Sequence, residues 1–324
     1  MQRCELLRAS AAALGLALLP GRPRAGRYPS RPVRLLVGFP AGSASDARAR
    51  LAAQHLGAAL TQPFVVENLP GNAATLAASI AARAAPDGHT LLVSSHGPLV
   101  IAPLVNPNVK LDPARAFATL GLLSNGGYVL LVKADAPYRS VADLVAAARA
   151  RPGRLSYSSS GPGSGNHLLM EMLKQATGTD LLHVPYKGAS PSLNDLAAGI
   201  VDASFETWIP AAPLVEAGKL RPLAVTAAQR EAFLPGTPTL AEAGHPEVTG
   251  DFWIGLFAPA ATPRPVQALL AQATRSMLAL PGYQTAVQRA GSGVKLLDDA
   301  ELAGFVPQEV ARWRPVLRRL KLAA

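Results

Sequence analysis

Two Ser- and Gly-rich stretches carry residue types that can bind an anion. FPAGSASDARAR (39–50) follows an apolar run and leads into an Ala-rich one, and LSYSSSGPGSGNHLLMEML (155–173) repeats that arrangement. At a strand-to-helix junction, the free N–H groups and the dipole of the helix N-terminus attract a carboxylate or a phosphate. An ordinary capped turn is compatible with each stretch taken alone.

The first stretch has the residues of a helix cap. Ser43 precedes Asp46 by three positions, the spacing of a capping box, and Gly42 allows a tight turn or a close approach to a ligand. No Gly-Lys-Ser/Thr follows, which excludes a P-loop, and the stretch is not G-x-S-x-G, the serine elbow of hydrolases.

The second stretch strengthens the anion hypothesis. Ser164, Gly165 and Asn166 can cap the following helix, while 158–160 offer three hydroxyls. In two facing α/β lobes, the carboxyl ends of the parallel strands lie at a shared cleft. One loop in each lobe would therefore form a clamp of helix N-termini around an anionic ligand.

Further polar groups follow other apolar runs. Tyr186 and Lys187 lie in HVPYKGASPSLNDL, Glu206 and Thr207 lie in FETW, and Ser95 lies in SSHGP. Lys187 could meet a ligand carboxylate or be a solvated surface lysine. Glu206 could accept from a ligand hydroxyl or amine, or it could cap a neighbouring backbone.

No catalytic or metal-binding pattern emerges. The six histidines, at positions 55, 89, 96, 167, 183 and 245, show no HxxxH or HExxH pairing, and Cys4 is the only cysteine. Nothing in the sequence selects one Ser-His-Asp combination. The expectation is binding without chemistry, with no metal and no cofactor.

Alternating apolar and Ala-rich runs predict two similar α/β lobes, each a mostly parallel sheet covered by helices. The chain is expected to cross between the lobes near 122–130 and 250–258. Lobe I then comprises 28–125 plus 253–324, and lobe II comprises 126–252. Strands are expected at 31–39, 64–68, 89–95, 128–133, 154–160, 181–186, 201–206 and 220–226, and helices at 46–60, 74–85, 141–150, 166–178, 192–199 and within the last 60 residues.

The N-terminus has the pattern of a secretory signal peptide. Arg3 and Arg8 precede a short small-apolar stretch, and residues 1–25 end on small residues after a helix breaker. We therefore expect a periplasmic protein without disulfides.

The charge balance excludes one class of partner. The net charge is +10, but the positive residues are mostly scattered arginines and aromatic residues make up only 5%. Stacking platforms for bases would be scarce, so no nucleic-acid binding is expected. A basic surface that attracts small anions fits better.

The ordered motifs resemble one family over roughly residues 28–322. YPSRPVRLLVGFPAGSASDARAR, ARAAPDGHTLLV, YSSSGPGSGNHL, HVPYKGASPSLNDLAAGIVD, LPGTPTLAEAG and WIGLFAPAATP are similar to the extracytoplasmic receptors of tripartite tricarboxylate transporters, the Bug-type binding proteins. The resemblance implies a type II-like Venus-flytrap fold with a hinge of crossing strands. It also implies a ligand that is a di- or tricarboxylate, an acidic amino acid or an aromatic acid, and two integral membrane subunits as partners. We expect the protein itself to be a monomer.

The family's ligand-binding positions fall on both loops and on the late strand. They map onto Ala41, Gly42, Ser43, Ala44, Asp46, Ser159, Ser160, Gly163, Ser164, His167 and Glu206. Four residues in or beside the same loops and strand ends complete the expected ligand-binding set: Phe39, Ser95, Tyr186 and Thr207.

The sequence departs from the family pattern at three places. Ser43 stands where relatives have a second glycine, Leu69 replaces an arginine in ENLPGNAATLA, and FETW replaces F-D-N. Two other functions are compatible with the sequence. One is a secreted hydrolase that uses Ser43 or Ser159, and the other is a periplasmic sensor-input protein.

Overall fold

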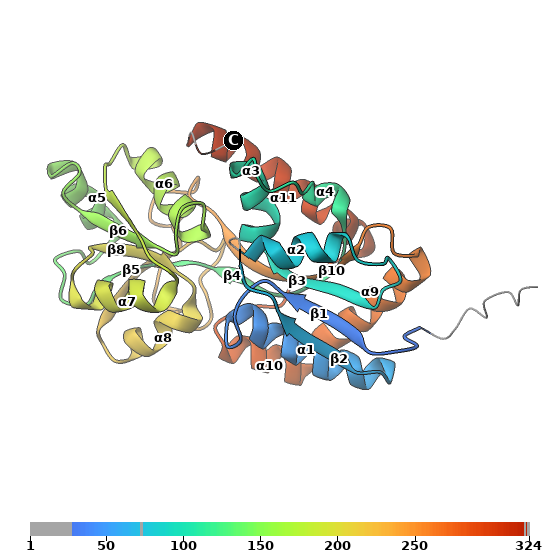
Figure 1. The fold of residues 1–324 in the computed structure, drawn as a ribbon. Helices are drawn as coiled ribbons and strands as arrows, with labels where there is room; N and C mark the ends of the chain where they lie inside the picture. Colours follow the sequence, from blue (N-terminus) through green and yellow to red (C-terminus); the bar gives the residue numbers. More distant parts are fainter. Residues whose placement is uncertain (1–27, 72–73, 321, 323–324) are drawn as a thin grey trace, which may run out of the picture.

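The computed structural model describes residues 28–71, 74–320 and 322, which fold into two lobes built around two five-stranded sheets (Figure 1). The predicted signal peptide, with Cys4, lies outside the described residues. None of the described helices is both long enough and apolar enough to cross a membrane.

The sheet of lobe I contains β1 (Val33–Val37), β2 (Phe64–Asn68), β3 (Thr90–Ser95), β4 (Phe117–Gly127) and β10 (Asp251–Pro259). Their order is β2-β1-β3-β10-β4. β1 is parallel to β2 and β3, whereas β10 is antiparallel to both of its neighbours. Four strands therefore run in one direction and only β10 is reversed.

The sheet of lobe II contains β5 (Val129–Lys133), β6 (Ser156–Ser159), β7 (Leu182–Pro185), β8 (Ala203–Glu206) and β9 (Leu220–Val225). Their order is β7-β6-β8-β5-β9, and again one strand, β5, runs against the other four.

The reversed strands are the two along which the chain enters a lobe. Only Tyr128 separates the end of β4 from the start of β5, and the first residue of β5, Val129, lies opposite Glu206 at the carboxyl end of β8. β10 likewise begins where Asp251 faces Gly127, the last residue of β4. A strand that enters at the edge facing the other lobe must run away from that edge. The predicted mostly parallel sheets are present, and each contains one reversed strand.

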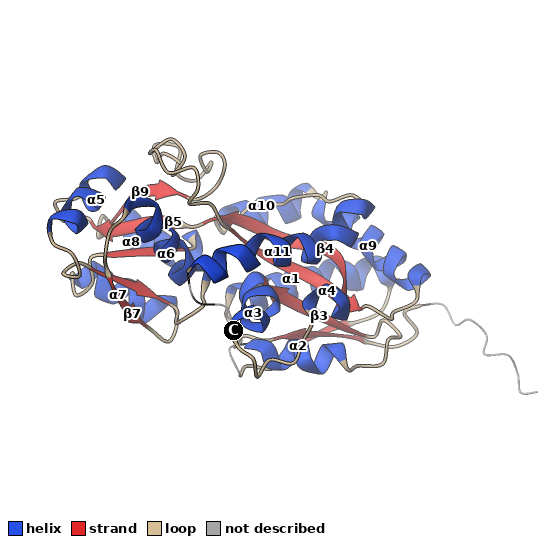
Figure 2. Cartoon of the chain, turned by 90° about the horizontal axis from the view of Figure 1, so that it is seen from above, coloured by secondary structure: helices blue, strands red, loops and turns tan. Residues whose placement is uncertain are grey.

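Helices cover both faces of each sheet (Figure 2). In lobe I, Leu35 and Leu91 pack on one face with residues of α1, α9 and α10, while Leu36 and Leu92 pack on the other with residues of α2 and α11. Alternate side chains of a strand point to opposite faces, so a strand buried on both sides is apolar throughout. The lobe I helices are α1 (Ala44–Leu60), α2 (Thr75–Ala82), the π-helical η2 (Gly97–Ile101), α3 (Ala102–Val105), α4 (Pro113–Ala116), α9 (Arg264–Leu278), α10 (Pro281–Arg289) and α11 (Asp299–Arg319).

Lobe II follows the same rule. Leu130 and Val132 of β5 pack with α5 and α6, and Val129 and Leu131 pack with α7 and α8. The helices are α5 (Val141–Ala150), α6 (Gly165–Thr177), α7 (Ala189–Ala198) and α8 (Trp208–Glu216).

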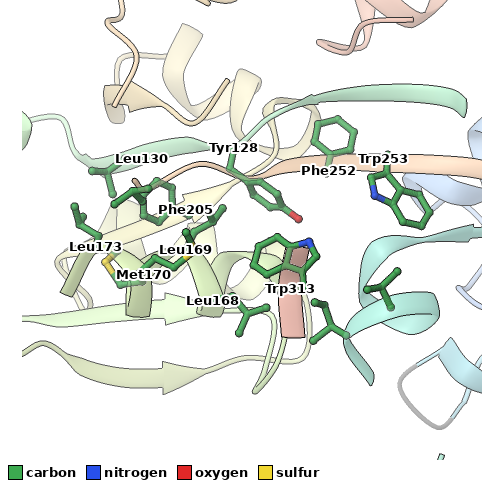
Figure 3. Close-up of a cluster of buried hydrophobic side chains, with 14 of the residues drawn as sticks. Tyr128, Leu130, Leu168, Leu169, Met170, Leu173, Phe205, Phe252, Trp253 and Trp313 are labelled. Carbon is green, nitrogen blue, oxygen red and sulfur yellow. The ribbon is translucent and has the colours of Figure 1, made fainter. Parts of the chain in front are cut away.

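One apolar cluster runs through the junction of the lobes. Tyr128, between β4 and β5, packs in one cluster with Trp313 of α11 and with Leu168 and Leu169 at the start of α6 (Figure 3). The two lobes therefore share buried surface beside the crossing strands.

Candidate functional site

Most of the predicted site residues follow strands at the sheet edges that face the other lobe. In lobe I the first loop follows β1, and Ser95 ends the neighbouring β3. In lobe II the second loop follows β6, and Glu206 ends the neighbouring β8. The strand directions thus place polar loops of both lobes beside the crossing strands.

The first loop is shaped by Asp46. Ser43 is the N-cap of α1 and its hydroxyl accepts from the Asp46 N–H at 3.2 Å, as the capping prediction requires. The Asp46 carboxylate accepts from the N–H of Gly42 at 2.9 Å. Gly42 has φ +83°, a conformation that glycine adopts without strain.

Both oxygens of Asp46 are engaged within the protein. Arg50 Nε donates to Oδ2 at 3.0 Å, and Asn68 Nδ2 donates to Oδ1 at 3.0 Å. Burial raises the pKa of the Asp46 carboxyl, but the hydrogen bonds from Arg50, Gly42 and Asn68 outweigh it and hold that pKa below its usual value. Asp46 is a buried anion that fixes the loop backbone.

The loop leaves backbone donors unused. Among the described residues, no acceptor partners the N–H groups of Ala44 and Ser45 in the first turn of α1. Ala41, Gly42 and Ala44 are exposed to solvent. The end of α1 therefore presents a positive dipole and free donors next to the sheet edge.

The second loop is held by side chains of its own lobe. Ser159 Oγ lies 2.6 Å from His183 Nε2 and accepts from the Gly161 N–H at 3.1 Å. His167 Nδ1 accepts from the Gly163 N–H at 3.1 Å. These contacts fold the loop back on β6 ahead of α6.

Asn166 joins this loop to β8. Its Oδ1 accepts from the Ser160 N–H at 3.2 Å, and its Nδ2 donates to Ser160 Oγ at 3.1 Å and to Glu206 Oε2 at 3.3 Å. The residue is only 3% exposed. Sequence reasoning treated Asn166 as a helix cap and missed this bridge, because it depends on β6 and β8 being neighbours.

Glu206 is a buried carboxyl with neutral hydrogen-bond partners. It is 4% exposed, and its Oε1 accepts from the N–H of Thr207 at 2.8 Å and from the Thr207 hydroxyl at 3.3 Å. Burial raises the pKa of Glu206 to about 7, although these hydrogen bonds and the one from Asn166 oppose the shift. The sequence allowed Glu206 either to accept from a ligand or to cap a neighbouring backbone group. The structure contains the second of these contacts, the hydrogen bond from the Thr207 N–H.

The histidines of lobe II form a stack. The rings of His167 and His183 lie 4.3 Å apart, and Tyr157 stacks on His183 at 4.9 Å. Burial lowers the pKa of His167 to about 4, with a smaller effect from His183. His167 is therefore neutral near pH 7, as an acceptor for the Gly163 N–H must be.

Two further predicted residues make local contacts. The Tyr186 hydroxyl donates to Asp195 of α7 at 2.7 Å. Phe39 packs on the lobe I core, and its carbonyl accepts from Asn68 Nδ2 at 2.9 Å. Lys187 is exposed.

The junction holds two residues that sequence reasoning did not single out. His96 and Tyr128 lie against Gly165, the first residue of α6, and both side chains are buried. Only the approach of lobe II brings them to a helix N-terminus, so no local pattern marks them.

The Ser159–His183 pair has the atoms of a nucleophile and a base, but not their setting. Ser159 is 0% exposed, and its Oγ already accepts from Gly161. A serine nucleophile needs access to a substrate carbonyl and an oriented base. Among the described residues, no group of three His, Cys, Asp or Glu side chains could hold a metal ion.

Comparisons with known proteins agree with this architecture. The model of the family described as "Tripartite tricarboxylate transporter family receptor" matches residues 48–322. Protein BugT of Bordetella pertussis is 31% identical, covering 91% of this chain and 90% of BugT.

Solved structures agree as well. "R. palustris Rpa4515 with adipate" superposes with a TM-score of 0.83 at 35% identity, covering 91% of this chain and 99% of that one. MatC from Rhodopseudomonas palustris "with bound malate" gives 0.78 at 30% identity, covering 90% and 100%. The chain therefore belongs to the receptor family of tripartite tricarboxylate transporters.

Proposed function

We propose that this protein captures a small carboxylate between its two lobes in the periplasm and delivers it to the membrane subunits of a tripartite transporter. The predicted signal peptide at 1–25 would direct it there. The bound adipate and malate of Rpa4515 and MatC support this class of ligand.

The observation that carries the proposal is the pair of helix N-termini at the facing sheet edges. The N–H groups of Ala44 and Ser45 on α1, and of Gly165 and Asn166 on α6, lack acceptors among the described residues. A carboxylate oxygen is a strong acceptor for such donors, and the helix dipoles add to the attraction.

Capture would proceed by closure of the lobes. Closure removes water from the ligand carboxylate and replaces it with fixed backbone donors, which strengthens each hydrogen bond in the drier site. Asp46 and Asn166 hold the two loops in shape before the ligand arrives, so little ordering remains to be done on binding. We expect a micromolar or lower dissociation constant, which corresponds to a binding free energy of about −8 kcal/mol or below.

A backbone donor can be deleted at the first position of α1. Ala44→Pro removes one N–H, and proline is favoured at this position of a helix because its φ is already helical. Ser43, the preceding residue, has ψ 162°, which a following proline accepts. Loss of a hydrogen bond to a charged group costs about 1.5–3 kcal/mol, so adipate should bind roughly ten- to a hundredfold more weakly by calorimetry.

The matched control is Ala44→Gly, which keeps the N–H. It should bind adipate within a few-fold of the parent protein. Equal affinities for Ala44→Pro and Ala44→Gly would show that this donor does not contact the ligand.

A further inference from the structure

Arg48, on the second turn of α1, is a buried cation with no acidic partner among the described residues. It is 4% exposed, and neither its Nε nor its Nη2 has a hydrogen-bond partner there. The only acidic residue in the first turn, Asp46, is bonded to Arg50. A buried guanidinium that lacks a counter-charge is unfavourable unless an anion reaches it.

Tyr283 of α10 connects Arg48 to β4. The charge of Arg48 opposes the burial that raises the pKa of Tyr283, and the Tyr283 hydroxyl donates to the carbonyl of Leu123 in β4 at 2.8 Å. Ser124, the next residue of β4, is 0% exposed, and its hydroxyl has no partner in the described part of the chain.

Ser292 adds a third unpartnered group near the end of β4. It is 4% exposed and its hydroxyl also lacks a partner among the residues described. The neighbouring Gly293 exchanges backbone hydrogen bonds with Asn125, the residue after Ser124. The loop after α10 therefore brings Ser292 to the same stretch of β4.

The pairing of β10 places Ser124 on the face of the sheet that α1 covers. Ser124 and Ser95 both lie opposite Ile254, and Ile254 packs in the cluster that contains Ala49 of α1 and Tyr283. Directly opposed residues of neighbouring strands share a face. Since β4 ends at Gly127, this cluster lies close to the sheet edge that faces lobe II.

We propose that Arg48, Ser124 and Ser292 form a second anion-binding site beneath the first turns of α1. Guanidinium and hydroxyl groups donate to carboxylates and to small inorganic anions alike. The anion is therefore either a second carboxylate of the solute or a free ion such as chloride. The first source rests on the proposed function, and the second does not.

Thermal unfolding in increasing sodium chloride tests the free ion. The variants are Arg48→Met and Ser124→Ala, and the control is Arg83→Met, which removes an exposed arginine with no salt bridge among those described. Screening by salt acts on all of the proteins. A bound chloride predicts that the parent protein and Arg83→Met gain several degrees of Tm that Arg48→Met does not gain.

Calorimetry with adipate and hexanoate tests the solute carboxylate, because these acids differ in their second carboxylate. If the second carboxylate of the solute occupies the site, Arg48→Met should bind adipate roughly tenfold or more weakly than the parent protein, while its affinity for hexanoate should stay within twofold. Ser124→Ala should show the same pattern with a smaller loss, which keeps the test open if Arg48→Met fails to fold.

Either response supports the site and identifies the source of its anion. The proposal is overturned if Arg48→Met and Ser124→Ala match Arg83→Met in both measurements. Failure of the parent protein to bind either acid would instead count against the proposed function, and the chloride series would still decide the role of Arg48.

Discussion

At the scale of single residues, the two buried carboxyls of the candidate site, Asp46 and Glu206, show how hydrogen-bond partners determine whether a buried acid is charged. Asp46 has Arg50 and two neutral donors, and its pKa stays below the usual value despite burial. Glu206 has only neutral donors, and burial raises its pKa to about 7. Glu206 therefore exchanges its proton near neutral pH, while Asp46 remains ionised.

The raised pKa of Glu206 predicts a pH dependence of stability. Its pKa of about 7 in the folded protein exceeds its usual value of 4.5, so its contribution to stability is fully present below pH 4.5 and is lost as the pH rises through about 7. The loss is about 3 kcal/mol at most. Glu206→Gln should remove this pH-dependent loss. The free energy of unfolding of the variant minus that of the parent should therefore increase between pH 4.5 and 7.

The test requires the difference in unfolding free energy between the variant and the parent, because two buried histidines change the stability of both proteins with pH in the opposite direction. Burial lowers the pKa of His96 and of His167 to about 4, so their contributions are lost as the pH falls below 6.5. Urea denaturation at several pH values gives the difference directly. A flat difference curve would mean that Glu206 is ionised in the folded protein at pH 5.

Local residue roles were predictable where they depend on short spacings. The cap formed by Ser43 on the Asp46 N–H was predictable because the two residues are three positions apart. The position of Glu206 at the sheet edge was predictable because Glu206 ends its strand. The bridge from Asn166 to Glu206 spans 40 positions, and Tyr283, whose charge interaction with Arg48 is the only one found for that residue among those described, lies in α10 near the other end of the chain. Neither leaves a local mark in the sequence.

At the scale of elements, α6 couples the second loop to the crossing strands. Its first residue, Gly165, lies so close to Tyr128 and His96 that a Cβ there would contact the Tyr128 hydroxyl and come within 2.8 Å of His96 Nε2. Both neighbours are buried and cannot turn away into solvent. The absence of a side chain at Gly165 therefore allows α6 to dock at the junction.

Gly165→Ala tests this docking. We expect overpacking at the junction to cost about 1–3 kcal/mol of unfolding free energy and to weaken carboxylate binding. Gly282, near the start of α10, is the control, because a Cβ there would meet no atom within 4 Å. Gly282→Ala should stabilise by about 0.4–1 kcal/mol without changing affinity. Denaturation and calorimetry on both variants decide the matter, and equal behaviour would show that α6 tolerates a side chain.

The alternating pattern predicted most strands and helices, because buried parallel strands and their covering helices leave strong periodic signals. It missed β4 as a long strand, since Gly121, Gly126 and Gly127 interrupt the apolar run. It also missed α8, whose Pro210 and Pro213 resemble a loop sequence. β4 is held by its pairing with β10, a partner more than 120 positions away.

At the scale of the whole molecule, the two reversed strands give the chain its receptor geometry. Because β5 and β10 start at the facing edges, the carboxyl ends of β1, β3, β6 and β8 all lie beside the crossing strands (Figure 1). Every loop that follows one of these strands then lies near the junction. Sequence periodicity predicted two lobes, but strand order depends on contacts between distant segments.

Ligand-induced stabilisation of the parent protein tests the central claim most directly. Melting temperatures should be measured with malate, adipate and, as an uncharged control of the same length, adipamide. Binding to the folded state alone raises the melting temperature, and at 100 times the dissociation constant it adds about 2.7 kcal/mol. For a receptor of small carboxylates, at least one of the two acids should raise the melting temperature by several degrees, and adipamide should not change it. No shift with either acid, or an equal shift with adipamide, would contradict it.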